Sequence, residues 1–462
     1  MGRGRDRGGR RRSGGRPAPV GAGGPKGRWV GALPRSRGER SGQGDSRAAG
    51  GPRPDSTPPP GEDGIGRWGA GLVKWLRWPA QGWATEARLL RWLTILWLVL
   101  GVAMLLSASY VTADSAHGDG LYYVKRQLLW IAIGVLLMRG VASMPLQGVL
   151  RLANGGLLLM LLLTWSLLVP GVGRQAYGAV RWVQLGPVPL QPSEFLKPLL
   201  VLQSARMLGH WERLTQGQRW FWLGTVAAAL VGILLQPNLS TTLLCGLVLW
   251  LLAIAAGLPW VYVGGAAIGG VMMAALSISL REYQQRRILS FLDPWADPFG
   301  AGYQLVQSLL AIGSGGWGGV GFGLSRQKLA NLPIQYTDFI FSVYAEEFGW
   351  IGSMLLLGLL GAYGWIGLRL ALKARDRVMR LVAVGTTAFL IGQSMLNVGV
   401  ATGALPTTGL PFPMLSYGGS SMLSSLILAG LLIRTAREIN AAPVVGLRNL
   451  EARGPRSPRP NP

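Results

Sequence analysis

Apolar runs of roughly 17 to 22 residues recur along the chain from residue 91 onward, with short polar segments between them. A helix rising 1.5 Å per residue needs about 20 apolar residues to cross the roughly 30 Å hydrocarbon core of a bilayer. We therefore predict an all-α polytopic membrane protein with about ten transmembrane helices. The predicted spans cover residues 91–110, 127–144, 150–169, 193–209, 219–236, 240–257, 259–279, 341–370, 381–401 and 418–434.

Arginine-rich connections predict the orientation of these helices. They lie at 208–219, at 371–380, after Arg434 and before the first span. With ten spans all four fall on one side, which the positive-inside rule makes cytoplasmic. Both termini are then cytoplasmic. The two large extracytoplasmic segments are 170–192 and 280–337, and the second of them forms the loop between predicted helices 7 and 8.

The ends of the chain differ from the membrane domain predicted at 91–440. Residues 1–66 are mostly Gly, Arg, Pro and Ser, and such a segment buries too little apolar surface to offset its chain entropy, so we predict a disordered basic cytoplasmic tail. Residues 67–90 set tryptophans among Arg and Lys, which favours a helix lying at the headgroup level. Residues 441–462 are predicted to be a cytoplasmic C-terminal tail.

The composition supports a membrane protein, since 49% of the 462 residues are hydrophobic and only 14% are charged. The net charge of +25 would suit a nucleic acid, but much of the excess lies before residue 80, so we predict no nucleic-acid partner. Cys245 is the single cysteine, which excludes an intramolecular disulfide and a cysteine metal cluster. With only two histidines, acid–base chemistry must fall to Asp, Glu, Lys or Tyr.

Positive charges on the predicted outer side are an exception to the positive-inside rule. They are Arg174, Arg181, Lys197, Arg281, Arg286, Arg287, Arg326 and Lys328. An anionic ligand at the outer leaflet would explain them, because Arg binds phosphate bidentately and Lys supplies a compact charge. Long loops also tolerate charge, since they are translocated largely regardless of it. The residue pattern leaves both interpretations open.

Several polar features lie at or near the ends of predicted spans. Glu194 and Lys197 share one helix face, either as a salt bridge at a span end or as a functional pair facing the bundle. Glu346 and Glu347 project about 100° apart, so at most one is expected to share a cavity with Lys197. The glycine-rich run 313–323 is either a turn packed closely on a helix or a direct substrate contact.

Five ordered motifs resemble the SEDS family of membrane proteins, the FtsW, RodA and SpoVE type. They are AYGAVRWVQLGPVPLQPSEFLK (176–197), QPNLSTT (236–242), DPWADPFGAGYQLVQSLLAIGSGG (293–316), GLSRQKLANLPIQYTDFIFSVYAEEFG (323–349) and LPTTGLPFPMLSYGGSSM (405–422). The similarity spans roughly residues 90 to 440. The run SRQKL at 325–329 is more similar to the division-type FtsW branch than to RodA.

This resemblance implies a peptidoglycan glycosyltransferase that polymerises lipid II at the outer face of the bacterial cytoplasmic membrane, at the division septum. It implies a class B penicillin-binding protein transpeptidase and other divisome membrane proteins as partners. It also implies that Asp297, directly before the PFGAGYQ stretch, is the catalytic residue. Asn238 stands where the family usually has Asp, and Tyr177 where Asn is usual, so Asn238 receives no acid–base role.

The reaction joins a sugar hydroxyl to an anomeric carbon whose leaving group is a polyprenyl pyrophosphate. One carboxylate base and several cations, or a divalent metal, are sufficient for it. We expect Asp297 to accept the hydroxyl proton, strengthened as a base by partial burial against Trp295, Phe299 or lipid. The residues expected to bind substrate or hold the site are Arg181, Glu194, Lys197, Arg287, Gln304, Lys328, Asp338, Glu347 and Ser416. A divalent cation, Mg²⁺ or Mn²⁺, would also serve, and no motif identifies its ligands.

Two other functions remain as alternatives. A lipid II flippase would use buried charge within ten spans, although such carriers often show inverted repeats, which this sequence lacks. A non-catalytic division scaffold would recruit partners through its tail. Purified protein incubated with lipid II distinguishes the three functions. A polymerase makes glycan, a flippase moves lipid II without making glycan, and a scaffold does neither.

Overall fold

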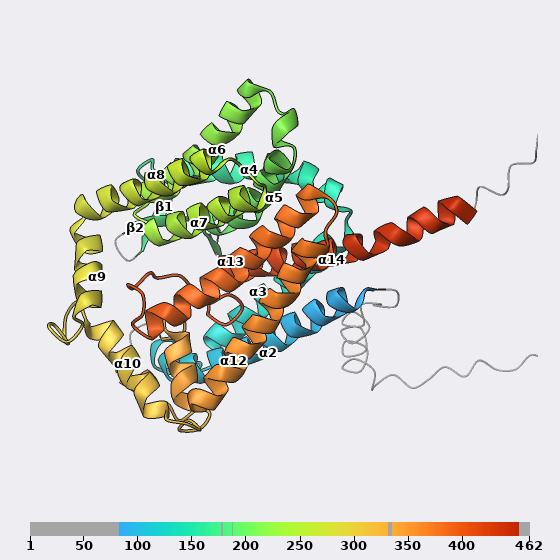
Figure 1. Ribbon diagram of the computed structural model, residues 1–462. Helices are drawn as coiled ribbons and strands as arrows, with labels where there is room; N and C mark the ends of the chain where they lie inside the picture. The colour runs from blue at the N-terminus through green and yellow to red at the C-terminus, as the bar shows by residue number, and fades with distance from the viewer. Residues whose placement is uncertain (1–82, 177–178, 187, 331–334, 452–462) are drawn as a thin grey trace, which may run out of the picture. The chain divides into compact units, whose positions relative to one another are not determined.

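The computed structural model describes residues 83–451 apart from 177–178, 187 and 331–334 (Figure 1). The predicted basic tail 1–66 lies outside the described residues. So do the part of the Trp-rich segment before residue 83 and the end of the predicted C-terminal tail.

Every predicted span coincides with a helix. The helices are α2 (Thr85–His117), α3 (Tyr122–Ser143), α4 (Leu146–Ser166), α5 (Pro192–Gly209), α6 (Gln216–Leu235), α7 (Leu239–Ala255), α8 (Trp260–Ser279), α12 (Ile340–Lys373), α13 (Arg377–Ala401) and α14 (Gly419–Glu451). Within the described residues, 8 helices are long and apolar enough to cross a membrane. Of the remaining two, α7 is shorter and α5 carries Glu194, Lys197 and Arg206. The multi-pass helical class is confirmed, and the count of ten crossings stays a prediction.

The segment after α4, which was predicted to lie on the outer side, contains a small sheet that was not predicted. Strands β1 (Gly173–Ala176), β2 (Ala179–Leu185) and β3 (Val188–Leu190) pair antiparallel in that order. Val183 faces Leu190 across the β2–β3 pair. Strands this short give a weak alternation signal, which a helix-dominated pattern conceals. The sheet carries Arg181 on its middle strand.

The long outer segment between α8 and α12 is also structured. It contains α9 (Glu282–Leu292), α10 (Tyr303–Gly315) and the short helix α11 (Gln327–Ala330). The undescribed residues 331–334 follow α11. The amphipathic pattern at 302–313 is confirmed as α10, which packs against α12. The 3-10 turn η1 (Trp211–Arg213) lies between α5 and α6.

The core of the bundle depends on close helix contacts. Helix α14 packs extensively on α3, where a Cβ added at Gly134 would lie 2.4 Å from the Leu426 side chain. Small residues let membrane helices approach in this way. The fully buried ring of Trp97 packs edge-on against Tyr363 at 5.7 Å and Phe412 at 6.3 Å between ring centroids. These rings join α2, α12 and the segment before α14.

Helix α12 is broken at Gly349, where φ is 63° and ψ is −162°. The glycine-rich run crosses this break and satisfies its backbone groups. Trp350 N donates to Gly316 O at 2.9 Å, and Val320 N donates to Glu346 O at 3.0 Å. Of the two interpretations of residues 313–323, close packing on a helix is therefore confirmed.

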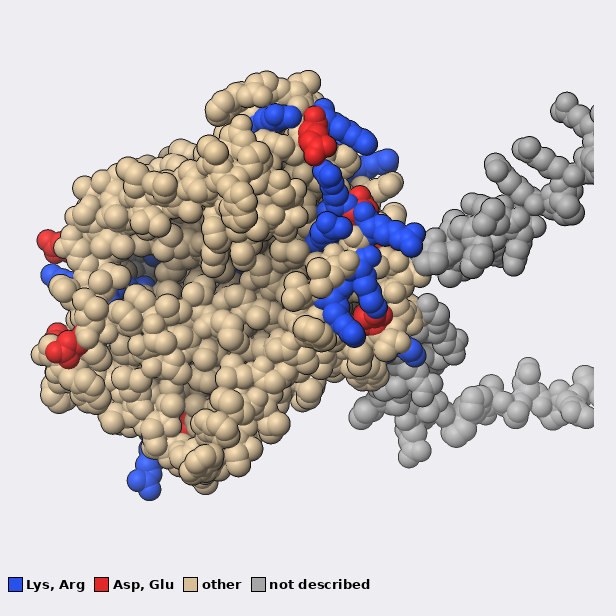
Figure 2. Space-filling model, in the orientation of Figure 1, with Lys and Arg blue, Asp and Glu red and all other residues tan. Residues whose placement is uncertain are grey.

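Charge and apolar surface are segregated. Lys and Arg side chains gather at one end of the helices, on the right of Figure 2, where α2 begins in the same orientation. Large apolar side chains stay exposed along the helices, for example Trp260, Val261 and Phe221. Lipid contact accounts for such exposure in a multi-pass protein.

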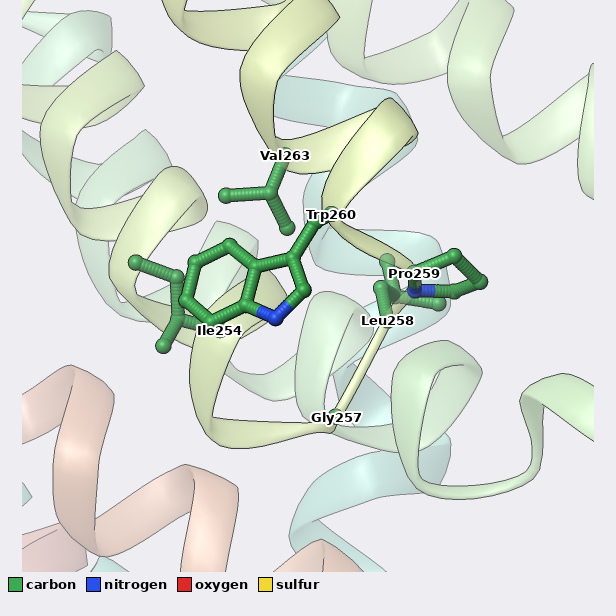
Figure 3. Close-up of a pocket in the computed structure, with 6 residues that line it drawn as sticks. All are labelled: Ile254, Gly257, Leu258, Pro259, Trp260 and Val263. Carbon is green, nitrogen blue, oxygen red and sulfur yellow. The ribbon is translucent and has the colours of Figure 1, made fainter.

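A small apolar pocket lies at the turn between α7 and α8 (Figure 3). Its lining residues are Ile254, Gly257, Leu258, Pro259, Trp260 and Val263. The Trp260 ring lies between the side chains of Ile254 and Leu258 in this view. None of these side chains titrates, so the pocket offers no catalytic group.

The break in α12 predicts a specific sensitivity to a methyl group. Gly349→Ala would place a Cβ 2.3 Å from Gly319 N in a backbone region that favours glycine. We expect it to destabilise the protein by about 1–3 kcal/mol, seen as a lower thermal unfolding midpoint in detergent. Gly358→Ala is the matched control, because a Cβ there meets nothing within 4 Å. Equal midpoints for the two variants would contradict the expectation.

Candidate functional site

Arg181 is held in place by backbone carbonyls at the end of α6. Its Nε donates to Gln236 O at 3.1 Å and its Nη2 donates to Pro237 O. Directly after these residues, the Asn238 side chain accepts the Thr241 N–H at 3.3 Å and caps α7. Asn238 therefore has a structural role, consistent with giving it no part in acid–base chemistry.

Arg287, on α9, lies next to Asp338. Its Nη1 donates to Thr407 O at 3.1 Å, and its guanidinium lies 4.5 Å from the centroid of the Tyr283 ring. A Cβ added at Gly409 would lie 3.7 Å from Asp338 Oδ2 and 3.9 Å from Arg287 Nη2. With φ at 72°, Gly409 lets the segment before α14 pass close to both side chains.

The arginine cluster, which we define as Arg181, Arg281 and Arg287, has an excess of positive charge. Burial lowers the pKa of the Arg181 guanidinium, and the neighbouring charges of Arg287 and Arg281 lower it further, while Tyr283 and Asp338 oppose them. Burial raises the pKa of the half-buried Asp338, against the opposing effect of Arg287 and Arg181. Among the groups acting on Arg181, Asp338 is the one carboxylate, and it is opposed there by Arg287 and Arg281.

Arg281 adds an unused donor to this cluster. Its Nη1 is buried and has no hydrogen-bond partner within the described part of the chain. Figure 2 shows Lys or Arg atoms recessed in a hollow on the left of the view, on the side of β2 and α9 in Figure 1. A buried donor and uncompensated guanidinium groups are suited to an anion with several oxygens. The sequence did not identify Arg281 as a site residue, because a single Arg just beyond a predicted span is also expected where it only caps the end of the helix.

Glu194 and Lys197 face the bundle interior. Lys197 Nζ donates to Glu194 Oε1 at 2.7 Å and to Gln393 Oε1 at 2.8 Å, and both charged side chains are almost fully buried. The interpretation as a pair facing the bundle is therefore the correct one. Such a pair costs solvation that only close partners offset.

Two polar side chains of α13 link this pair to the arginine cluster. Gln393 Nε2 donates to Pro411 O at 2.6 Å, and Asn397 Nδ2 donates to Asp338 O at 2.8 Å and to Leu410 O at 2.9 Å. They hold the segment before α14 beside Asp338. The sequence reading missed both residues. The sequence signal that could have identified them is their spacing at i and i+4, which places two polar side chains on one face of an apolar helix.

Both glutamates of α12 bind the segment that precedes it. Lys328 Nζ lies 2.7 Å from Glu347 Oε1 and also donates to Ser107 Oγ at 2.7 Å. Glu346 Oε1 accepts the Arg326 N–H at 2.9 Å. Neither glutamate pairs with Lys197, which agrees with the expectation that at most one of them would share its cavity. The two glutamates project from α12 about 100° apart, and the segment that precedes the helix contacts both because it wraps across the helix.

Asp297 lies in the exposed loop between α9 and α10, outside the arginine cluster. Its Oδ2 accepts the Ala301 N–H at 2.9 Å, and a Cβ at Gly300 would lie 2.2 Å from that oxygen. Trp295 and Phe299 are 56% and 90% exposed, so the expected burial of Asp297 against them is wrong. The tight glycine turn places backbone, rather than an aromatic ring, against the carboxylate.

The remaining candidates have local roles. Asp293 Oδ1 accepts the N–H groups of Trp295 and Ala296, at 3.1 and 3.2 Å, which makes it a turn residue. Gln304 is half-buried in the first turn of α10. Ser416 is buried, and its hydroxyl donates to Thr337 O and accepts from Phe412 N. Ser416 thus fastens the segment before α14 to the residue preceding Asp338.

This geometry defines a class: a polytopic helical membrane protein whose outer segments build a cationic, partly buried site. A family model described as "Cell cycle protein", covering FtsW, RodA and SpoVE, matches residues 87–441. The chain belongs to this family, and the resemblance seen in its motifs is confirmed.

Individual relatives agree with the family assignment. The chain is 53% identical to a probable peptidoglycan glycosyltransferase FtsW of Synechocystis sp., over 79% of this chain and 93% of that protein. It is 38% identical to the stage V sporulation protein E of Bacillus subtilis, over 75% of this chain and 95% of that protein.

Solved structures are similar as well. The crystal structure of the Thermus thermophilus rod shape determining protein RodA matches with a TM-score of 0.57 and 29% identity, over 78% of this chain and 98% of that chain. A structure titled "Structural coordination of polymerization and crosslinking by a peptidoglycan synthase complex" matches with a TM-score of 0.59 and 32% identity, over 74% of this chain and 97% of that one.

The buried pair of Lys328 and Glu347 predicts a charge-specific effect on stability. Lys328→Met leaves the Glu347 carboxylate buried without its cation, and we expect a loss of about 3–5 kcal/mol. The double variant Lys328→Met/Glu347→Gln removes both charges and should recover at least half of that loss. Thermal unfolding in detergent measures both. A double variant no more stable than the single one would show that charge neutralisation is not what the pair contributes.

Proposed function

We propose that this chain is a peptidoglycan glycosyltransferase that polymerises lipid II into glycan strands at the outer face of the cytoplasmic membrane. The observation that carries the proposal is the arginine cluster, in which Arg181 and Arg287 act on the carboxylate of Asp338 and Arg281 adds a further positive charge beside Arg181. A diphosphate on a polyprenyl carrier presents several anionic oxygens at the membrane surface, which is the ligand chemistry that such a cluster favours. The names of two relatives, both called peptidoglycan glycosyltransferase FtsW, support the same activity.

In this reaction the acceptor hydroxyl oxygen attacks the anomeric carbon of the donor sugar. The new bond joins that carbon to the oxygen, the bond from the carbon to the diphosphate breaks, and the electron pair leaves with the diphosphate. Asp297 accepts the hydroxyl proton as general base. The arginine cluster stabilises the charge that develops on the leaving group, so no second carboxylic acid is needed.

The position of Asp297 supports this division of labour. Its loop directly follows α9, which presents Arg287, and its carboxylate is fixed by the Ala301 N–H while staying exposed. In the proposed complex the bound sugars cover Asp297 and remove the water around it, so that the acceptor hydroxyl lies directly against the carboxylate. The substrate thus supplies the burial that the free protein lacks.

The two buried ion pairs position the site without contacting substrate. Glu194 and Lys197 act through Gln393 on the segment before α14, and Lys328 with Glu347 holds the segment before α12. Ser416 fixes the residue next to Asp338. Gln304, half-buried on α10, is available to a sugar hydroxyl.

The described residues do not form a metal cage of their own. No three His, Cys, Asp or Glu side chains come together among them in a metal-binding arrangement. Mg²⁺ or Mn²⁺ would therefore be held chiefly by the diphosphate oxygens of the substrate. The steps above use only side chains of the chain.

The partner and the location extend the same proposal. A similar structure is that of a complex that polymerises and crosslinks peptidoglycan, which supports a class B penicillin-binding protein transpeptidase as partner. The FtsW-named relatives support the division septum and other divisome proteins. The Lys and Arg side chains at one end of the helices support cytoplasmic termini.

Asp297→Asn tests the catalytic assignment. The Asn side chain can still accept the Ala301 N–H but cannot take a proton, so we expect lipid II polymerisation to fall by at least about 100-fold. Purified protein with labelled lipid II, analysed by gel for glycan, is the measurement. Asp293→Asn is the matched control in the same loop and should retain polymerisation.

Each alternative predicts a different result in this assay. Full activity of Asp297→Asn would remove the residue from catalysis. Lipid II movement across vesicles without polymer would indicate a flippase. If wild-type protein, alone and with its partner, neither makes glycan nor moves lipid II, the result would indicate a non-catalytic scaffold.

Arg281→Gln tests the arginine cluster. It removes a buried donor to the diphosphate, and we expect KM for lipid II to rise by about tenfold. Arg286→Gln is the control on the same helix, because Arg286 is exposed and pairs with Glu282 at 3.4 Å. Steady-state kinetics of both variants decide the matter, and equal KM values would exclude Arg281 from the diphosphate site.

A further inference from the structure

Five aromatic rings gather where the end of α2 and the start of α3 meet the segments before α12 and α14. They belong to His117, Tyr122, Tyr123, Tyr336 and Tyr417, which we name the tyrosine platform. His117 stacks on Tyr122 at 3.8 Å and Tyr123 stacks on Tyr336 at 4.7 Å between ring centroids. Tyr123 also meets His117, Tyr122 and Tyr417 edge-on, at 5.6, 5.3 and 5.0 Å.

The platform is assembled from three separate segments. The end of α2 and the start of α3 supply the first rings, and the segments before α12 and before α14 supply Tyr336 and Tyr417. Tyr417 N donates to Tyr336 O at 2.9 Å, and the buried Gln127 bonds Ser416 O and Gly418 N, both at 3.2 Å. The rings are therefore held in fixed positions before any ligand arrives.

Exposure and polarity suit a wet ligand with apolar faces. His117 is exposed and the four tyrosines are half-buried, so ring edges and faces remain accessible. Arg126 Nη1 donates to the Tyr122 hydroxyl at 2.8 Å, which places a cation at the rim. An aromatic body with a polar tip is suited to sugar rings, whose C–H faces pack on aromatic faces while their hydroxyls bond to polar groups.

The platform is continuous with the proposed reaction site. Tyr336 lies two residues before Asp338 in the chain, and Ser416, next to Tyr417, bonds the intervening Thr337 O. A polymer growing beside Asp338 would meet these rings. We propose that the tyrosine platform is a binding subsite for the sugar rings of the glycan strand, distinct from the diphosphate site. The inference rests on the proposed function, because that function supplies the strand.

An aromatic belt at the membrane surface is the competing account. Belt residues act singly toward lipid, whereas these rings stack on one another and bind through three segments. Tyr110 provides the comparison. It is 50% exposed near the same end of α2, and its ring packs against Gly120 rather than joining the platform.

Binding of an uncrosslinked glycan hexasaccharide to the full chain carrying Asp297→Asn tests the proposal without turnover. Tyr122→Leu removes a stacked ring and should weaken binding by about fivefold, while Tyr122→Phe keeps the ring and should retain binding. His117→Ala, at an exposed position, should weaken it by about threefold and serves if Tyr122→Leu does not fold. Tyr110→Leu should leave binding unchanged.

The outcomes separate the two proposals. Unchanged binding in Tyr122→Leu and His117→Ala would overturn the platform, as would equal weakening by Tyr110→Leu, which is the belt result. Glycan made by wild-type protein at equal lipid II consumption should be longer than that made by Tyr122→Leu. If the hexasaccharide binds in a way that depends on Tyr122 but the wild-type protein makes no polymer, the proposed function would be refuted, while the tyrosine platform would stand as a sugar-binding site.

Discussion

Two ion pairs buried among the helices, one of Glu194 with Lys197 and one of Lys328 with Glu347, connect the outer segments to the bundle. In a lipid-facing protein a buried charge without a partner is very costly, so each pair requires one arrangement of the segments around it. The first pair acts through Gln393 on the segment before α14. The second pulls the segment before α12 against α2 through Ser107. The segments before α12 and α14 therefore take their positions from charges buried inside the bundle.

The same separation explains why the candidate chemistry lies at the surface. The arginine cluster is held by backbone carbonyls instead of carboxylates, which leaves its positive charge available. Asp297 is held by a glycine turn that leaves its carboxylate exposed. In the proposed reaction a substrate bridges Asp297 and the arginine cluster and excludes the solvent between them.

Much of the fold follows from the order of the residues. All ten apolar runs are helices, and the amphipathic run after Asp297 is α10, because helix in an apolar environment depends on local composition and internal hydrogen bonds. The outer sheet was missed, since strands of three to seven residues acquire their pairing only from the folded segment. Of the candidate site residues, the motifs contain Arg181 and Asp338, and Arg287 was chosen from the positive charges on the predicted outer side. Arg281, Gln393 and Asn397 were not chosen as site residues.

The sequence by itself determined the membrane class, the helices, the family motifs and the turn role of Asp293, because these depend on composition and on neighbours a few residues away. Only the tertiary structure decided which charges pair. Glu347 meets Lys328 and not Lys197, since side chains on different elements meet only when the helices pack. Likewise, among the described residues, the buried Nη1 of Arg281, beside Arg181, has no hydrogen-bond partner. The tertiary structure also brought five rings from three segments into one platform, which the spacing of these residues in the sequence does not predict.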